Sequence, residues 1–234
     1  MLVGGRIARA VVAACAVAAL TGCTSDPPAP TPQPSGATLD VTVLRAALLE
    51  PKDVGETWKA PERSGAPVTL VSLCGGDPAV PPVPGRPAVT GSVLVDEGEA
   101  GAQSLEQVAL AYDGPAAATA GLTALRAVAQ ACPGTVTKAS EIRENKRLPG
   151  YTETVTTTPL NPRGWSGFVV VRHRAYEATS RPATGDTAVA VLSTRNVVLV
   201  VAYSIYRLGA QSTGPGFTAD WQRLVGSVAR RVGG

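Results

Sequence analysis

The chain contains few residues of the kinds that carry out catalysis. Among its 234 residues there is one histidine, His173, which lies between two arginines in an apolar run. A Ser-His-Asp arrangement would have to use it, and catalytic zinc sites commonly use several histidines. Ser166 lies in "GWSG", one residue short of the Gly-x-Ser-x-Gly motif. We therefore interpret His173 as a half-buried strand residue and expect no catalytic residue, cofactor or metal site; a hydrolase using Ser166 or His173 is the lowest-ranked alternative.

Other motifs that bind or react with ligands are also absent from the sequence. No P-loop, dinucleotide fingerprint or His-Glu-x-x-His motif is present. Asp96, Glu97 and Glu99 follow a predicted strand, and grouped carboxylates could bind a metal ion or do acid–base work. Their spacing is typical of a solvated turn, which is the interpretation we favour.

A predicted strand at 165–178 brings three candidate binding residues to one face. Because side chains alternate along a strand, Arg172, Arg174 and Tyr176 point the same way. They could line a groove for an anionic or amphipathic ligand. The alternative, which the sequence favours, is that this face is exposed to water and that the arginine stems cover apolar surface.

The N-terminal segment has the pattern of a lipoprotein signal peptide. Arg6 and Arg9 precede an apolar run at 10–20 that is too short to span a bilayer, which takes about 20 residues. The next residues, "LTGC", resemble a bacterial lipobox, which implies cleavage after residue 22 and thioether lipidation of Cys23. The alternative is an ordinary secreted protein in which Cys23 is incidental.

A proline-rich segment follows Cys23. Residues 23–37 contain five prolines, which favour an extended, solvated chain. We expect a tether between a multiply acylated, palmitate-bearing cysteine and a folded domain, because several acyl chains anchor stably where one does not. This predicts a protein bound to the cell membrane by its lipid, on the extracytoplasmic face.

Once Cys15 and Cys23 are assigned to the signal peptide and the anchor, Cys74 and Cys132 remain. Disulfides persist outside the cytoplasm, so we predict a Cys74–Cys132 bridge. The alternative, a reactive thiol, needs a nearby base. The formal net charge of +3 includes two arginines of the signal peptide, and nothing suggests nucleic-acid binding.

Residues 38–234 are expected to form one α+β domain with helices packed on a mainly antiparallel sheet. The predicted order is helix, strands, helix, strand meander, helix. A helix is expected after Asp40 and another at 115–131, and the last begins near Thr218. Strands are expected at 88–96, 103–113 (with a possible bulge near 106–107), 150–158, 165–178, 187–193 and 196–206. Residues 197–206 are nearly all apolar, which predicts a central strand covered on both faces.

Several stretches together resemble a known group: the lipobox, the tether, "LLEPKDVGETW", "LCGG", "AQACPG" and a final helix bearing a tryptophan. They are similar to actinobacterial sensor-domain lipoproteins related to the extracellular domain of the PknH receptor-type serine/threonine kinases. The resemblance implies an α+β fold with disulfide support and a cleft for an unidentified ligand; one bridge expected of the kinase domain would be absent here.

These patterns lead us to expect a lipid-anchored, sensor-like envelope domain without catalytic activity that binds a small ligand or a cell-wall component. The alternative is a lipoprotein that docks on another envelope protein during interaction or assembly. The resemblance carries no catalytic residues over to this chain.

Overall fold

The computed structural model describes residues 38–62, 68–75, 80–98, 101–177, 183–209 and 214–233. The predicted signal peptide, the predicted lipidation site Cys23 and the predicted tether lie outside these ranges, as does Glu99. Within the described residues, none of the helices has the length and apolar character needed to cross a membrane.

Seven antiparallel strands form one sheet, in the order β1-β2-β9-β8-β7-β6-β3. The strands are β1 (Ala88–Gly98), β2 (Gly101–Ala111), β3 (Thr135–Lys138), β6 (Tyr151–Pro159), β7 (Ser166–Tyr176), β8 (Ala183–Thr194) and β9 (Val197–Leu208). A separate hairpin consists of β4 (Glu141–Arg143) and β5 (Lys146–Leu148), and the helices are α1 (Val41–Ala47), α2 (Pro51–Val54), α3 (Pro115–Gln130) and α4 (Gly214–Gly233). The predicted α+β class and the order of elements are confirmed.

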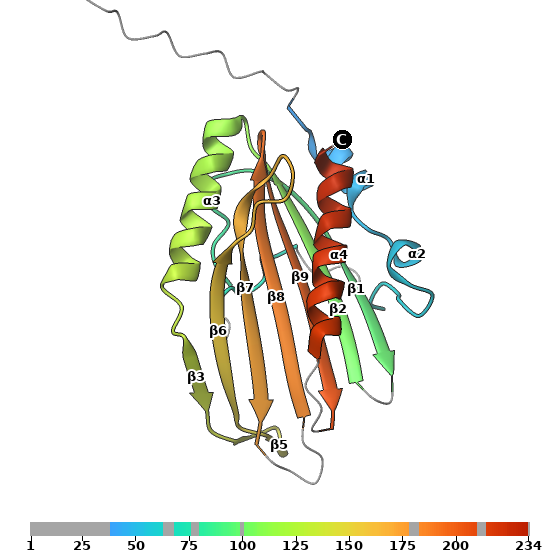
Figure 1. Ribbon diagram of the computed structural model, residues 1–234, viewed down its shortest axis with the longest axis vertical. Helices are drawn as coiled ribbons and strands as arrows, with labels where there is room; N and C mark the ends of the chain where they lie inside the picture. Colours follow the sequence, from blue (N-terminus) through green and yellow to red (C-terminus); the bar gives the residue numbers. More distant parts are fainter. Residues whose placement is uncertain are drawn as a thin grey trace, which may run out of the picture. The chain divides into compact units, whose positions relative to one another are not determined.

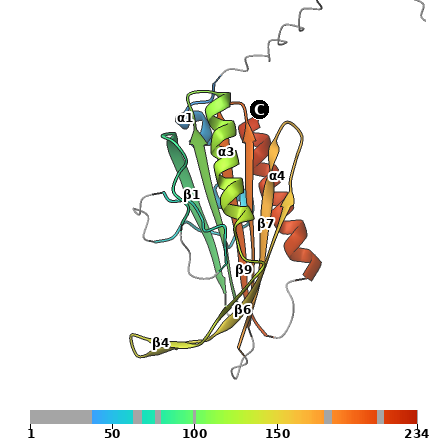
Figure 2. The same cartoon turned by 90° about the vertical axis from the view of Figure 1, so that its left-hand side faces the viewer.

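Helices cover both faces of the sheet (Figures 1 and 2). Helix α3 buries Ala118, Leu122, Leu125 and Ala129 against one face, which we call the α3 face. These residues recur every three or four positions, so they form one stripe on the helix. Helices α1 and α4 cover the opposite face, where Trp221, Leu224, Val225 and Val228 of α4 pack.

Strand β9 is central and buried on both faces, as predicted, since it lies between β2 and β8 and its residues Val197–Tyr203 are all buried. A tight turn at Arg195 and Asn196 connects β8 to β9, with Arg195 at a φ of 49°. The bulge expected in β2 is wrong: its pairing with β1 runs without interruption from Ala88↔Ala111 to Gly98↔Gly101. The pattern changes there because residues 107–110 are buried on both faces.

The helix expected after Asp40 is confirmed, and the start of the last helix needs correction. The first helix ends at Ala47, and α2 follows as a separate turn; Asp40 caps α1 by accepting hydrogen bonds from the backbone of Thr42 and Val43. Helix α4 begins at Gly214, four residues before the expected N-cap Thr218, so a propensity for capping did not decide its start.

The charged stretch 141–147 is exposed and forms the β4–β5 hairpin. Glu144 and Asn145 both have positive φ, as a two-residue hairpin turn requires. The hairpin projects from the lower end of the sheet in Figure 2.

Candidate functional site

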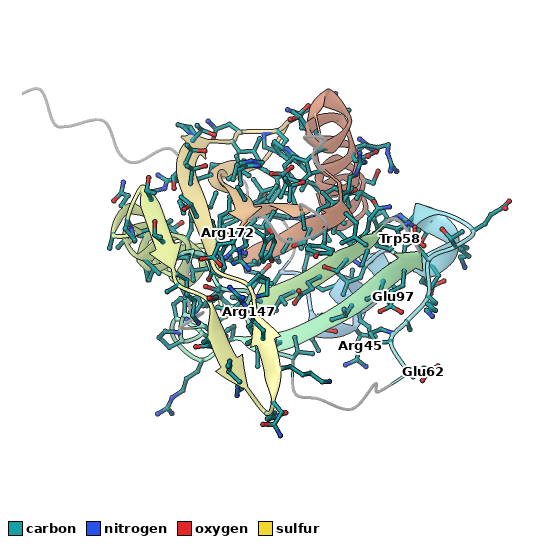
Figure 3. The ribbon with its side chains drawn as sticks, turned by 90° about the horizontal axis from the view of Figure 1, so that it is seen from below. Arg45, Trp58, Glu62, Glu97, Arg147 and Arg172 are labelled. Atoms are coloured by element: carbon teal, nitrogen blue, oxygen red, sulfur yellow. A yellow bond between two sulfur atoms is a disulfide. The ribbon has the colours of Figure 1, made fainter. Side chains whose placement is uncertain are left out.

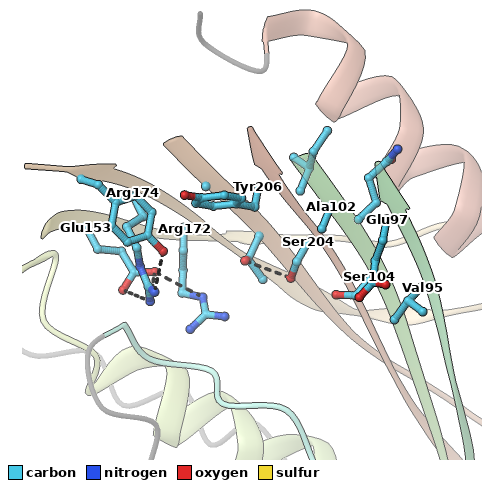
Figure 4. Close-up of a pocket in the computed structure, with 14 residues that line it drawn as sticks. Val95, Glu97, Ala102, Ser104, Glu153, Arg172, Arg174, Ser204 and Tyr206 are labelled. Carbon is cyan, nitrogen blue, oxygen red and sulfur yellow. Dashed lines mark hydrogen bonds and ion pairs between the residues drawn. The ribbon is translucent and has the colours of Figure 1, made fainter. Parts of the chain in front are cut away.

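A pocket of about 420 Å³ opens on the α3 face, at the end of the sheet beyond the last turn of α3. It is lined by residues of β1, β2, β6, β7, β8 and β9. Figure 4 shows these side chains on neighbouring strands. The three candidate residues from the sequence, Arg172, Arg174 and Tyr176, all line this pocket.

The pocket contains two arginines that share a buried carboxylate. Arg174 Nη2 donates to both carboxylate oxygens of Glu153, at 3.3 and 3.2 Å. Arg172 Nε lies 3.9 Å from Glu153 Oε1, which is an ion pair without a hydrogen bond. Register explains the grouping, because Glu153 is the direct partner of Arg174 across β6 and β7. Two positive charges therefore surround one negative charge.

Arg172 is buried, with 9% of its surface exposed. Its Nη1 donates to the carbonyl oxygen of Cys74 at 2.9 Å, whereas Nε is buried and has no hydrogen-bond partner. Burial lowers the pKa of Arg172, and Glu153 opposes that shift. The interpretation favoured from the sequence, a face exposed to water, is therefore wrong at this residue: the segment at Cys74 covers the side chain.

Arg174 is held by aromatic residues as well as by Glu153. Its guanidinium lies 4.1 Å from the centre of the Tyr151 ring, and Nη1 donates to Tyr176 Oη at 3.3 Å. Burial opposes the charge of Arg174, but the bond to Tyr176 and the Glu153 charge outweigh it, so its pKa is raised. Tyr176 also makes edge contacts with the rings of Tyr151 and Tyr206. The pocket therefore has a basic side next to an aromatic wall.

Hydroxyl groups form another part of the lining. Thr187 Oγ1 and Ser204 Oγ are hydrogen-bonded at 3.0 Å across β8 and β9, and Ser104 is the partner of Ser204 on β2. Glu97 on β1 also lines the pocket; it is exposed and lies 3.8 Å from Lys59 Nζ. Figure 3, which looks at this end of the sheet, shows Arg172 in the interior and Glu97 on the outer strand.

A second glutamate on the α3 face affects the charge balance. Glu106 lies on β2, and its side chain points to the α3 face. Burial raises the pKa of Glu106, and the positive charge of Arg172 opposes that shift. The net charge around Arg172 therefore becomes more positive as pH falls and Glu106 takes up a proton.

His173 lies on the opposite face from the pocket. Its Nδ1 contacts Oδ1 of the buried Asp186, and its side chain is 45% exposed. The predicted position in a strand is confirmed, whereas His173 is more exposed than expected. Ser166 lies seven residues away on the same strand, about 23 Å along it, and points to the other face. The two side chains therefore cannot form one nucleophile–base pair. Of the acidic cluster, Asp96 accepts a bond from Gln103 at 3.4 Å; the described residues contain no group of three metal-ligating side chains.

The predicted Cys74–Cys132 disulfide is present. Cys132 follows α3, and Cys74 belongs to the segment that covers Arg172. The bridge thus joins the end of α3 to the border of the pocket.

Sequence reasoning missed Glu153, Glu106 and Tyr206. These residues lie on three different strands, and only the register of the sheet brings them to the α3 face beside Arg172 and Arg174. Within β6, the alternation of "YTETV" could have placed Glu153 on the buried face, because Val155 two residues later is buried on that side.

The structure defines an α+β domain: an antiparallel sheet with helices on both faces and a pocket at one end. No protein-family model and no curated protein matches the chain. It is similar to the crystal structure of the extracellular domain of PknH from Mycobacterium tuberculosis, with a TM-score of 0.54 and 17% sequence identity. The match covers 84% of this chain and 98% of that chain. The expected resemblance is therefore confirmed for the fold.

Proposed function

We propose that the chain is a non-catalytic domain that binds a small anionic ligand in the pocket on the α3 face. The observation that carries this proposal is that Arg172 and Arg174 both line one pocket of about 420 Å³. An anionic oxygen in this pocket would accept charge-assisted hydrogen bonds from guanidinium N–H groups. Arg172 and Arg174 carry two positive charges against the one negative charge of Glu153, and Glu106 on the same face offsets the second when it is ionised.

The remaining lining residues restrict the ligand further. Tyr176 and Tyr206 provide an aromatic wall, and Ser104, Thr187 and Ser204 provide hydroxyl groups that both donate and accept hydrogen bonds. This combination favours a phosphate or carboxylate attached to a ring. A fragment of a cell-wall component has this chemistry, as do many small metabolites.

A pair of matched probes tests this proposal. We expect phenyl phosphate to shift the NMR signals of pocket residues, and phenol, which lacks the anion, to bind at least about tenfold more weakly. Arg172→Gln should lose that discrimination, whereas Arg230→Gln, at an exposed position on α4, should keep it. Equal binding of both probes, or unchanged binding by Arg172→Gln, would refute the proposal. Mass spectrometry of ligands carried by native material would then identify the natural occupant.

We further propose that a lipid on Cys23 holds the domain on the extracytoplasmic face of the cell membrane. The support is the apolar segment at 10–20 followed by "LTGC" and the proline-rich stretch. The likeness to an extracellular domain agrees with this location. Cells fed an alkynyl palmitate analogue should label the wild-type chain and leave Cys23→Ser unlabelled; equal labelling of the two would contradict lipidation at Cys23.

Docking on another envelope protein is the second candidate function. The observation in its favour is Ile142, which is 80% exposed on the β4–β5 hairpin. A photoreactive residue at position 142 should then crosslink to one protein in intact membranes. Crosslinks no more abundant than from position 230 would rule out this role for the hairpin.

A further inference from the structure

The segment that covers Arg172 is not part of the sheet. Leu70 and Leu73 are buried against α3, and Cys74 and Gly75 continue toward β6 and β7. The Cys74 carbonyl accepts hydrogen bonds from Arg172 Nη1 and from Ser72 Oγ, both at 2.9 Å. This segment therefore meets the pocket through a backbone carbonyl, whose position depends on how the segment is held.

Gly75 continues the same contact. A Cβ atom at this position would collide with the carboxylate of Glu153 and would also touch Val155. The absence of a side chain lets the backbone lie directly against the carboxylate that Arg172 and Arg174 share. Two consecutive residues thus contact the buried ion pair: Cys74 contacts Arg172, and Gly75 contacts Glu153.

The disulfide connects this segment to a rigid element. Cys132 lies just after α3, where the backbone N–H of Cys132 still donates to Ala129 at 3.3 Å. Helix α3 is fixed on the sheet by its buried stripe. Since the segment around Cys74 has no strand pairing of its own, the bridge to α3 restrains the carbonyl that holds Arg172.

We propose that the Cys74–Cys132 disulfide is a positioning device for Arg172, so that the affinity of the pocket for anions depends on the bridge. This inference rests on the proposed function, because it concerns the same pocket. Without the bridge, the Cys74 carbonyl is less restrained, the hydrogen bond from Arg172 Nη1 weakens, and the guanidinium leaves the orientation in which it meets an anion.

The first experiment measures phenyl phosphate binding by the full chain in a double-mutant cycle. The four proteins are the wild type, Cys74→Ala/Cys132→Ala, Arg172→Gln, and the combination of all three changes. Loss of the bridge should weaken phenyl phosphate binding by about tenfold, the value of one hydrogen bond to a charged group. In the Arg172→Gln background, removing the bridge should have no further effect, because the effect acts through that side chain.

A second measurement reads the position of Arg172 without a ligand. The Nε–H of Arg172 is buried, so its NMR signal should exchange slowly with water in the oxidised chain. Dithiothreitol reduces the bridge to two thiols and is itself oxidised to a cyclic disulfide. After this reduction, exchange of the Arg172 Nε–H should accelerate by about tenfold, as expected when a hydrogen bond of a charged group is lost.

Trp165→Phe serves as the control for loss of stability alone. Trp165 donates to the Ala229 carbonyl at 3.2 Å, at the opposite end of β7 from the pocket. This variant should be less stable and should bind phenyl phosphate as the wild type does. A disulfide-free chain that binds like the wild type, or an equal loss in the Arg172→Gln background, would overturn the positioning role. If the oxidised wild type fails to bind the probe, the proposed function is overturned, and the exchange of the Arg172 Nε–H still decides the role of the bridge.

Discussion

Replacing Glu153 with glutamine removes the charge that Arg172 and Arg174 share while keeping the size of the side chain. The Glu153 side chain is 3% exposed, and those of Arg172 and Arg174 are 11% and 26% exposed. Removing one partner of a buried ion pair typically costs about 3–5 kcal/mol, because the remaining charge stays buried without compensation. Arg174 can turn toward water, so we expect the lower end of this range, about 3 kcal/mol.

Urea denaturation measures this loss. With a typical slope of about 2 kcal/mol per molar urea, the midpoint should fall by roughly 1.5 M. Inorganic phosphate should stabilise Glu153→Gln more than the wild type, because phosphate binding to the folded state supplies a negative charge that the variant lacks. A lower urea midpoint together with a larger stabilisation by phosphate would show that the same charges determine the stability of the domain and its affinity for anions.

Glu106→Gln is the matched control, since Glu106 is a half-buried glutamate on the same face. Burial raises its pKa from 4.5, so the folded state binds this proton more tightly than the unfolded state does. Stability attributable to Glu106 is therefore present below pH 4.5 and is lost as pH rises through the folded pKa. Glu106→Gln should remove that pH dependence without destabilising the domain at neutral pH. If Glu153→Gln were as stable as the wild type, or no less stable than Glu106→Gln, the ion-pair reasoning would be refuted.

Three further predictions concern other contacts of the domain. Gly75→Ala should displace the Glu153 carboxylate and weaken phenyl phosphate binding by about tenfold. Gly134→Ala, at an open position, should leave phenyl phosphate binding unchanged, and NMR titration of the two variants compares their affinities. Burial raises the pKa of Tyr203 from 10.0 to about 12, so its contribution to stability is lost as pH rises between these values, and Tyr203→Phe should remove the last step of the tyrosinate absorbance titration. Hydrogen bonds from an arginine of α4 hold the pKa of Asp53 at about 2, so this ion pair stabilises the domain above pH 3.8 and is lost toward pH 2; Asp53→Asn should flatten acid denaturation in that range.

Local patterns in the sequence were sufficient to predict most of the helices and strands. The stripe of α3 and the alternation in β7 depend on residues a few positions apart, and helix and strand geometry then determine which side chains share a face. For this reason the sequence alone predicts that Arg172, Arg174 and Tyr176 share a face, as they do in the structure.

The burial of these residues was not predictable from the same patterns. Whether Arg172 faces water depends on the segment at Cys74, which is 98 residues away in the chain. The carboxylate of Glu153 reaches the arginines through the pairing of β6 with β7, and Asp186 reaches His173 through the pairing of β7 with β8. Such partners depend on the register of the whole sheet, which no local periodicity specifies.

The described domain begins near the end of the sheet that lies opposite the pocket. Leu39 exchanges two hydrogen bonds of 2.9 Å with the side chain of Asn196, in the turn between β8 and β9. The pocket lies eight to ten residues further along β9, at Ser204 and Tyr206, which corresponds to about 30 Å. The residue at which the described chain begins and the pocket therefore lie near opposite ends of β9.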